Sequence, residues 1–211
     1  MNECYSSKKK ALIIISGMPG TGKTYLASKI VEDHPDLVIL SYDSIKESFW
    51  DRFGFDNENE KRAINESALV EFYKQLDLMM KKGEDIIIEY PFNDKHKQKL
   101  QDLVERRGYH ALSIYLYGDL HKMYERRSKR DRLKDRHAGH SSNSFHRGET
   151  VQNRFSMTED DFLKDIENKD YDIRIGKTIS VDTTEFDEID QEKIRKAIND
   201  LLDKSQETTD C

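Results

Sequence analysis

Short runs of apolar residues alternate along the chain with longer segments whose apolar residues recur at helical spacing. The runs over 11–15 and 37–40 are continuous and apolar, which is typical of strands buried on both faces. All the apolar runs together predict strands over 11–15, 37–40, 86–88, 111–117 and 179–181. The periodic segments predict helices over 22–33, 44–50, 61–82, 94–107 and 121–136, and a last helix with Ile194, Ala197, Ile198, Leu201 and Leu202 on one face. Because strands and helices alternate, we predict an α/β fold with a five-stranded parallel sheet flanked by helices.

Residues 137–157 interrupt this alternation. The segment is rich in His, Ser, Asn and Gly and shows no clear period. A loop of this length inside a compact domain is usually functional or mobile. With the helix before it, the segment forms a lid and insert over about 119–157, within a single domain of residues 1–211 whose tail frays from about residue 206.

The composition narrows the class of protein. Of the 211 residues, 36% are charged and 36% hydrophobic, and the formal net charge is -6. This balance indicates a globular protein with a polar surface and disfavours one that coats nucleic acid. Cys4 and Cys211 provide no disulfide framework, and no apolar run is long enough for a signal peptide or a membrane span. We expect a cytoplasmic protein with no membrane partner and no obligate protein partner.

A phosphate-binding loop follows the first predicted strand. The residues from Gly17 to Thr24 read GMPGTGKT and match G-x-x-x-x-G-K-[ST] completely, directly before a predicted helix. Glycines let successive backbone N–H groups point inward and form an anion cradle with the helix N-terminus. We expect Lys23 to reach the β- and γ-phosphates and Thr24 to bind Mg²⁺. The expected nucleotide-binding residues are Gly17, Gly20, Thr21, Gly22, Lys23, Thr24 and Tyr25.

The motif alone does not separate kinases from GTPases and other nucleotide-binding proteins. Residues 168–171 approach the guanine-reading N-K-x-D motif, but Tyr171 stands at the aspartate position. Residues 51–54 match D-x-x-G, but no strand precedes them. Neither segment supports a GTPase.

Two carboxylates follow predicted strands. Asp43 comes just after the second strand and Glu89 ends the third, so parallel pairing places both at the edge where ligands bind. There Asp43 can accept the proton of a hydroxyl, and its alternative role is to cap the next helix. Glu89 can hold Mg²⁺ through water or touch the acceptor, and its alternative is a solvated strand end. Asn93 is expected to cap the following helix.

The predicted helix over 121–136 is strongly basic. Between Lys122 and Arg136 the chain has eight basic residues against three acidic ones, more than pairing within the helix requires. Arg126 and Arg130 share one face, as do Arg132 and Arg136. Such a helix suits a lid that neutralises a transferring phosphoryl group, and its alternatives are a solvated helix or a nucleic-acid groove. A groove is less favoured because no aromatic stacking platform accompanies it.

Taken together, these motifs resemble the small P-loop kinases filed as AAA-type ATP-binding proteins. The resemblance rests on GMPGTGKT, the aspartate after the second strand, the ERRSKRDR and RHAGH stretches, and VDTT near the end. It is nearest to the 5′-kinase domain of polynucleotide kinase, chloramphenicol phosphotransferase and the zeta-toxin group. It implies a P-loop NTPase fold with an arginine-rich helical lid, Lys23 and Thr24 on ATP·Mg²⁺, Asp43 as the base, and Arg126 and Arg130 on the transferring phosphate.

The resemblance also indicates residues for the base of the nucleotide and for the acceptor. Asp182 and Thr183, in VDTT, would lie against adenine. Lys46 stands where polynucleotide kinases usually carry an arginine. His137 and His140 form too small a set for a metal site, and their alternatives are a contact with phosphate or substrate, or plain surface positions. The expected acceptor-binding residues are Asp43, Lys46, Glu89, Arg136 and His137.

The leading hypothesis is an ATP-dependent phosphotransferase that moves the γ-phosphate to a hydroxyl of a small molecule or of a nucleotide or nucleic-acid end. Its expected partners are ATP, Mg²⁺ and a hydroxyl-bearing acceptor, with a nucleic-acid end the less favoured acceptor. Two alternatives stay open. One is a regulatory ATPase without an acceptor, and the other is a toxin kinase of zeta type.

Overall fold

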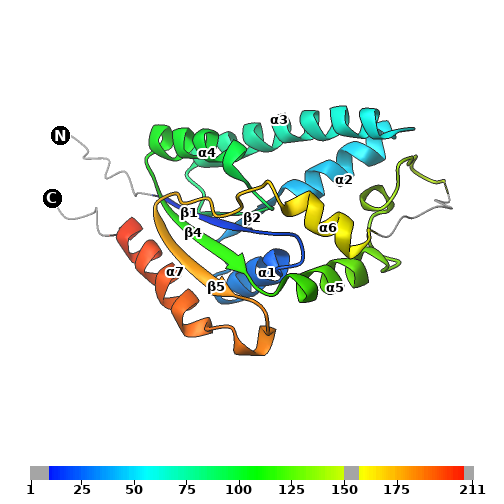
Figure 1. The fold of residues 1–211 in the computed structure, drawn as a ribbon. Coiled ribbons are helices and arrows are strands. Elements are labelled where there is room, and N and C mark those ends of the chain that lie inside the picture. Colours follow the sequence, from blue (N-terminus) through cyan, green and yellow to red (C-terminus); the bar gives the residue numbers. More distant parts are fainter. Residues whose placement is uncertain (1–9, 150–156, 207–211) are drawn as a thin grey trace.

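A five-stranded parallel sheet forms the centre of the molecule (Figure 1). The computed structural model describes residues 10–149 and 157–206. The strands run in the order β2-β3-β1-β4-β5. Their bounds are β1 Lys10–Gly17, β2 Val38–Ser41, β3 Ile86–Glu89, β4 Tyr109–Tyr117 and β5 Lys177–Asp182. The predicted α/β fold with five parallel strands is confirmed.

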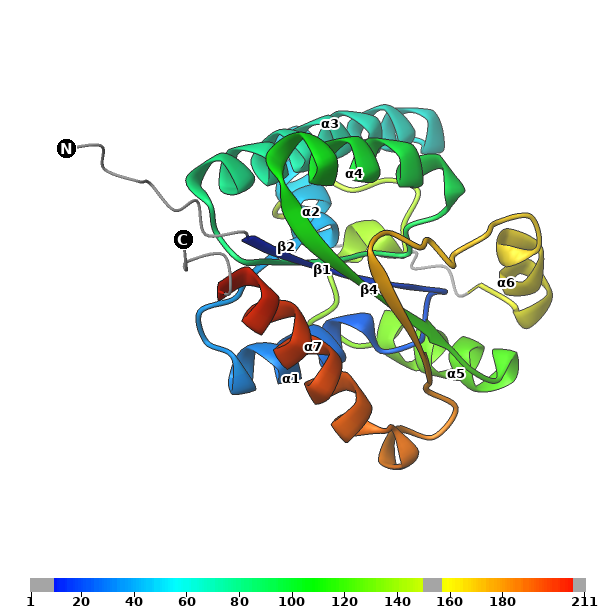
Figure 2. The same cartoon turned by 90° about the vertical axis from the view of Figure 1, so that its left-hand side faces the viewer.

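Helices cover both faces of the sheet (Figures 1 and 2). The helices are α1 Lys23–Asp33, α2 Tyr42–Phe53, α3 Glu58–Lys82, α4 Asp94–Arg107, α5 Leu120–Asp131, α6 Glu159–Ile166 and α7 Gln191–Gln206. Leu26 of α1 and Ile198 of α7 pack against β1 on one face. Leu76 of α3 and Leu100 of α4 pack on the other. The apolar residues of β1 and β3 are therefore buried from both sides. In the edge strand β2, Val38 and Ile39 are exposed, so the prediction that this strand is buried on both faces was wrong.

The strand register brings candidate site residues to one edge. Ser41 pairs in register with Glu89, and Glu89 with Ile15 of β1, so the ends of β2 and β3 lie level with the start of the phosphate loop. On the other side of β1, Gly17 pairs with Leu116. The carboxyl edge of the sheet thus presents residues from distant parts of the sequence at one level.

The helix boundaries differ from prediction after β4. Helix α5 ends at Asp131, not at Arg136, and residues 132–136 continue in turns. Arg132 and Arg136 therefore do not share a helix face. The chain leaves the helix where Asp131 gathers ion pairs from Arg127, Arg130 and Arg136. The short helix α6 was not predicted from the sequence.

Two predicted helix ends are confirmed, and several other predictions concern residues outside the described ranges. Gly83 and Gly108 end α3 and α4 with φ of 75° and 66°, as expected of helix-terminating glycines. Cys4, Cys211, residues 150–156 of the insert and the tail from 207 lie outside the described residues. Within the described residues, no helix is both long and apolar enough to cross a membrane.

Candidate active site

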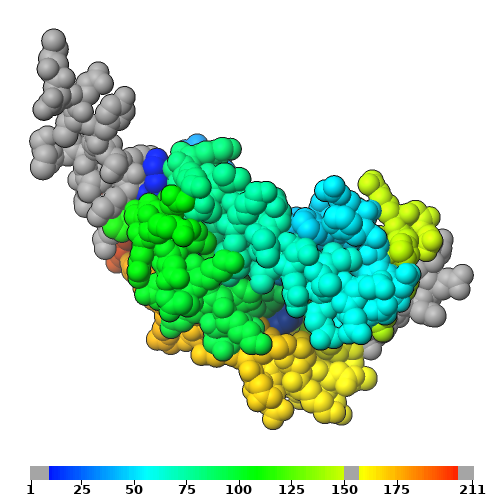
Figure 3. Space-filling view, turned by 90° about the horizontal axis from the view of Figure 1, so that it is seen from above, coloured from blue at the N-terminus to red at the C-terminus, as the bar shows by residue number. Residues whose placement is uncertain are grey.

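A cavity of about 520 Å³ lies at the carboxyl edge of the sheet. The phosphate loop, α2, the segment from Glu89 to His96, α5 and the residues around α6 contribute to its walls. Figure 3 shows the surface hollowed between α4 and α6, with N-terminal residues at the bottom of the hollow. One cavity therefore brings together the phosphate loop and both candidate carboxylates.

The phosphate loop has the conformation that its glycines permit. Gly20 and Gly22 adopt φ of 92° and 85°, in the left-handed region that disfavours other residues. A side chain on Gly20 would collide with the backbone carbonyl of Met123 in α5, so the basic helix rests directly on the loop. Thr21 stabilises the turn by donating from Oγ1 to the carbonyl of Met18 at 2.8 Å. The loop is thus a rigid cradle whose N–H groups remain for an anion.

Lys23 is buried at the floor of the cavity. Its Nζ donates to the carbonyls of Gly17 at 3.0 Å and Met18 at 2.8 Å. Burial lowers the pKa of Lys23 to about 8, although the negative charges of Glu89 and Asp43 oppose the shift. A bound phosphate would raise this pKa again and stabilise the charged ammonium group, so the site favours binding of an anion.

Glu89 lies between the phosphate loop and α2. Thr24 Oγ1 donates to Glu89 Oε2 at 3.2 Å, and Ser41 Oγ donates to Oε1 at 2.9 Å. The carboxylate is buried, and burial followed by the charge of Asp43 raises its pKa. Glu89 is therefore not a solvated strand end.

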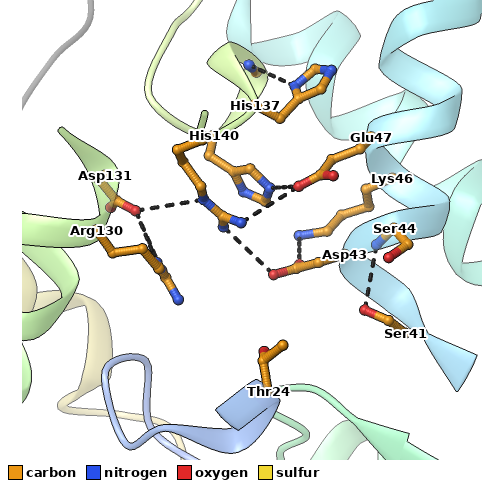
Figure 4. Close-up of polar contacts among 12 residues, drawn as sticks. Thr24, Ser41, Asp43, Ser44, Lys46, Glu47, Arg130, Asp131, His137 and His140 are labelled. Atoms are coloured by element: carbon orange, nitrogen blue, oxygen red, sulfur yellow. Dashed lines mark hydrogen bonds and ion pairs between the residues drawn. The ribbon is translucent and has the colours of Figure 1, made fainter. Parts of the chain in front are cut away.

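Asp43 lies in the first turn of α2 and faces the cavity (Figure 4). Ser41 caps this helix instead, since its side chain accepts from the N–H of Ser44. Asp43 pairs with Lys46 at 2.7 Å and with Arg136 at 3.7 Å. Burial raises the pKa of Asp43, but the charges of Lys46, His140 and Arg136 outweigh it and hold the pKa well below its usual range. Capping is therefore not the role of Asp43.

Lys46 is surrounded by aromatic rings. Its Nζ lies 5.1 Å from the ring centre of Tyr42, 5.2 Å from that of Tyr90 and 5.5 Å from that of Trp50. Its side chain is largely buried. The rings favour the cation and restrict its movement, so Lys46 is a fixed partner of Asp43.

Helix α2 carries an acidic stripe, which we define as Asp43, Glu47 and Asp51, spaced four residues apart. The segment 136–140 meets this stripe along its length. Glu47 lies 2.6 Å from His140 Nε2 and 3.5 Å from Arg136 Nη1, as Figure 4 shows around Glu47 and His140. Asp51 lies 3.2 Å from His137 Nε2. The insert thus contacts the helix that carries the candidate base.

The two histidines of the insert have different positions. His137 packs against Trp50 and Phe145 and accepts the N–H of Gly139 at Nδ1, so its Nε2 carries the proton toward Asp51. It does not line the cavity, whereas His140 does. The structure therefore does not bring His137 together with the other expected acceptor residues.

The arginines of α5 diverge from one another. Arg126 donates to the carbonyls of Thr183 at 2.5 Å and Thr184 at 2.6 Å, and its guanidinium stacks 3.9 Å from the ring centre of Phe186. Arg130 pairs with Asp131 at 3.3 Å, and its charge acts on Lys23. Arg126 therefore lies toward the end of β5, and Arg130 lies over the phosphate loop.

The turn after β5 supports the side of the cavity where Arg126 lies. Thr183 is buried and donates from Oγ1 to the carbonyl of Tyr117, and Asp182 accepts the N–H of Thr184. Neither lines the main cavity, whereas Tyr25 and Phe186 do, with their rings stacked 5.7 Å apart. The VDTT turn therefore supports the Arg126 side of the cavity through its backbone, and the rings of Tyr25 and Phe186 form the cavity wall there.

Sequence reasoning missed several residues of this cavity: Tyr90, Arg127, Asp131, Tyr171 and Phe186 line it, and Glu47 supports it through Arg136 and His140. Only Glu47 had a usable signal, the spacing of four residues from Asp43 and Asp51. The others depend on long-range contacts.

The donors near the phosphate loop fit a hard divalent cation. Thr24 and Glu89 offer oxygen atoms beside the anion cradle, which is the donor type that Mg²⁺ prefers. Among the described residues there is no group of three or more His, Cys, Asp or Glu side chains that could hold a metal alone. The protein oxygens therefore suit a cation that phosphate and water also coordinate.

Comparison with known proteins agrees with this geometry. Residues 13–152 match the family described as "AAA domain". The chain belongs to this family of P-loop kinases. Among curated proteins, none matches the chain. Family membership implies nucleotide binding, generally with a divalent metal.

Two solved structures share the fold. One, from Chloroflexus aurantiacus J-10-fl, is described as a "putative kinase"; it is 25% identical, the match covers 92% of this chain and 99% of that one, and the TM-score is 0.74. The other is a gluconokinase from Sinorhizobium meliloti 1021, 14% identical over 95% of each chain, with a TM-score of 0.56. The second likeness shows the fold alone. The P-loop kinase fold is thus confirmed.

Proposed function

We propose that this P-loop kinase transfers the γ-phosphoryl group of ATP to a hydroxyl group of an acceptor, with Asp43 as the base. The observation that carries the proposal is the placement of Asp43. It faces the same cavity as the phosphate loop, close enough for its charge to act on both Lys23 and Glu89. A protein that only bound ATP would not require a second carboxylate at this position.

In the proposed reaction the acceptor oxygen bonds to the γ-phosphorus while the bond from phosphorus to the bridging oxygen breaks, and ADP leaves. Lys23 binds the β- and γ-phosphates, and Arg130 neutralises the charge on the transferred group. The hydroxyl proton passes to Asp43. The phosphoryl group thus ends on the acceptor, the bridging oxygen leaves with ADP, and the proton ends on Asp43.

The low pKa of Asp43 suits this role. The carboxylate is ionised throughout the physiological range because Lys46 and Arg136 stabilise its charge against the effect of burial. In a loose transition state the acceptor loses its proton late, so the base orients the hydroxyl more than it pulls on the proton. A fixed, ionised carboxylate meets that need.

Thr24 would hold Mg²⁺ directly and Glu89 through water. The ion would neutralise charge that develops on the phosphate oxygens. Arg126, Tyr25 and Phe186 would contact the base of the nucleotide, because they lie where the β5 turn meets the phosphate loop. Helix α5 would act as the lid over the phosphates and over the base of the nucleotide. With ATP as its phosphate donor, the protein is assigned to the cytoplasm.

The test is transfer of labelled phosphate from ATP into small alcohols and 5′-hydroxyl oligonucleotides by the wild type and Asp43→Asn. We expect the variant to lose about a hundred- to ten-thousand-fold in transfer. It should keep its ATP affinity and melting temperature, because Ser41 caps α2. Asp36→Asn, an exposed carboxylate outside the cavity, is the matched control.

Unchanged transfer by Asp43→Asn would contradict its role as the base and make Glu89 the next candidate. ATP binding without transfer to any alcohol or oligonucleotide would favour a regulatory ATPase. Growth arrest on expression of the wild type, relieved by Asp43→Asn, would instead identify the toxin class of kinase.

A further inference from the structure

The part of the cavity away from the nucleotide has walls of its own. We define the acceptor half as Tyr90, Asn93, His96, Arg127, Lys169 and Tyr171. Its two sides are joined by a backbone hydrogen bond, in which the N–H of Asp94 donates to the carbonyl of Asp170 at 3.1 Å. Figure 3 shows the hollow enclosed by chain on both sides. Such walls fit a small compound and not a continuous polymer.

The cavity has an excess of positive charge. Among the described residues, seven lysine and arginine side chains and four carboxylates line it, which leaves three positive charges over. Mg·ATP brings about two negative charges, so about one positive charge remains when the nucleotide is bound. An acceptor with one anionic group would neutralise it.

Arg127 is the cation placed to meet that group. Its charge acts on both Lys23 and Tyr171, so it lies on the side of the acceptor half that is nearest the phosphate loop. Its Nε lies 3.6 Å from Asp131 Oδ2, and its Nη1 lies 3.6 Å from Asp165 Oδ2. Both distances are too long for a hydrogen bond, so these are ion pairs alone. Its buried Nη1 has no hydrogen-bond partner among the described residues. A partly buried guanidinium whose buried Nη1 makes no hydrogen bond among the described residues points to a missing anion.

Two phenol groups line the cavity together with Arg127: the charge of Arg127 acts on Tyr171, which also interacts with Tyr90. Tyr171 is buried and Tyr90 is partly buried, and neither hydroxyl makes a hydrogen bond within the described part of the chain. Burial raises the pKa of Tyr171 to about 12, so its hydroxyl remains a donor at neutral pH. Hydroxyl donors beside a guanidinium are typical of sites that bind carboxylate or phosphate.

We propose that the acceptor is a small hydroxy compound with an anionic group, carboxylate or phosphate, which Arg127 binds with help from Tyr90 and Tyr171. Its hydroxyl group faces Asp43 and receives the phosphoryl group by the reaction given above. The proposal rests on the proposed kinase function. It adds a residue for the acceptor that the basic-helix motif did not distinguish from its neighbours.

The first experiment measures anion binding without turnover. Inorganic phosphate is titrated by calorimetry into the full chain saturated with the non-hydrolysable nucleotide Mg·AMP-PNP, which occupies the phosphate loop. We expect one further phosphate to bind, and Arg127→Gln to weaken it by about tenfold to a hundredfold. Lys129→Gln, an exposed cation on the same helix, should bind it as the wild type does.

The second experiment measures transfer to matched pairs of acceptors: glucose with gluconate, and glycerol with glycerate and glycerol 3-phosphate. We expect kcat/KM for an anionic member to exceed that of its neutral partner by about tenfold or more. Arg127→Gln should remove this preference through KM, with a larger loss of kcat/KM toward the anionic member than toward its neutral partner. The carboxylate and phosphate members show which anion is preferred.

Several results would overturn the inference. In the first experiment these are no binding of inorganic phosphate beside Mg·AMP-PNP, or binding that Arg127→Gln does not weaken. In the second they are a preference for the neutral member of a pair, or an equal loss of kcat/KM toward both members in Arg127→Gln. Equal loss would place Arg127 on the transferring phosphoryl group instead. Binding of inorganic phosphate beside Mg·AMP-PNP without transfer to any acceptor would contradict the kinase function but leave the anion site in place. Failure of the anion site and failure of the kinase function are therefore distinguishable.

Discussion

The nucleotide side and the acceptor half of the cavity are built in different ways. The phosphate-binding part comes mainly from one continuous segment, in which left-handed glycines and the start of α1 form the anion cradle. The acceptor half combines side chains from the start of α4, from α5 and from the segment after α6. The first depends on local backbone geometry, and the second on contacts between segments far apart in the chain.

The difference shows where functional information lies in this protein. Backbone N–H groups recognise phosphate whatever the side chains are, so a short motif is enough to identify them. Acceptor recognition needs particular side chains at particular places, and these reach the cavity only through the tertiary fold. Substitutions on the two sides should therefore affect different kinetic quantities.

The largest effect is expected at Lys23. Lys23→Ala removes the ammonium group from the phosphates and should lower turnover by about a thousandfold. The fold should survive, because burial of this charge without a phosphate is itself unfavourable. Turnover and melting temperature are measured together, with Lys29→Ala on the exposed face of α1 as the control. Transfer at the wild-type rate would break the assignment of the nucleotide side.

A pair of substitutions in α5 sharpens the comparison. Arg130→Gln should lower kcat by about a hundredfold with a small change in ATP affinity, since Arg130 lies toward the transferring phosphate. Arg126→Gln should chiefly raise KM for ATP, because Arg126 binds the β5 turn and Phe186. Steady-state kinetics with varied ATP separates the two. A large loss of kcat with unchanged KM for Arg126→Gln would place both arginines on the phosphate.

A smaller effect is expected at the acidic stripe. Glu47→Gln removes the charge that pairs with His140 and Arg136, and it should lower kcat by about tenfold through misplacement of Asp43. ATP affinity should not change. Asp51→Asn, which affects only the contact with His137 outside the cavity, should change kcat less. Equal losses in both variants would indicate a general loosening of α2, which melting temperatures would register.

The smallest predicted effect concerns pH and only the nucleotide side. Burial lowers the pKa of free Lys23 to about 8, and bound phosphates favour its charged form. Below pH 8 the lysine is already protonated; above it, ATP binding must take up a proton, so affinity falls as pH rises. We expect the dissociation constant for ATP to be about threefold larger at pH 8.5 than at pH 7.5. Lys23→Arg, charged throughout, should show no such change at this residue.

The sequence predicted the sheet and the phosphate loop well because both are local patterns. Buried strands read as unbroken apolar runs, and Gly83 and Gly108 marked two helix ends. The end of α5 was wrong by five residues, since Arg136 leaves the helix for partners on α2. Helix α6 was missed because eight residues carry too few apolar positions for a clear period.

The same reasoning explains what could be predicted of the candidate site. Asp43 and Glu89 were accessible because parallel strands bring their ends to one edge. Tyr90, Tyr171 and Arg127 were not, since nothing in their neighbourhood along the chain distinguishes them from ordinary core or surface residues. Their surroundings arise only when the tertiary fold brings α5, the segment after α6 and the segment from Tyr90 to His96 to the walls of one cavity.

A small hydrophobic cluster, separate from the two faces of the sheet, joins the insert to α2 and the residues just after it. Trp50, Phe55 and Phe145 form it, and Phe55 and Phe145 also exchange backbone hydrogen bonds of 2.9 and 2.8 Å. A cluster of this size can open without unfolding the sheet, as an independent cooperative unit. The amide protons of Phe55 and Phe145 should therefore exchange with solvent faster than those of β1. Their exchange rates report directly on how firmly the insert contacts the helix that carries Asp43.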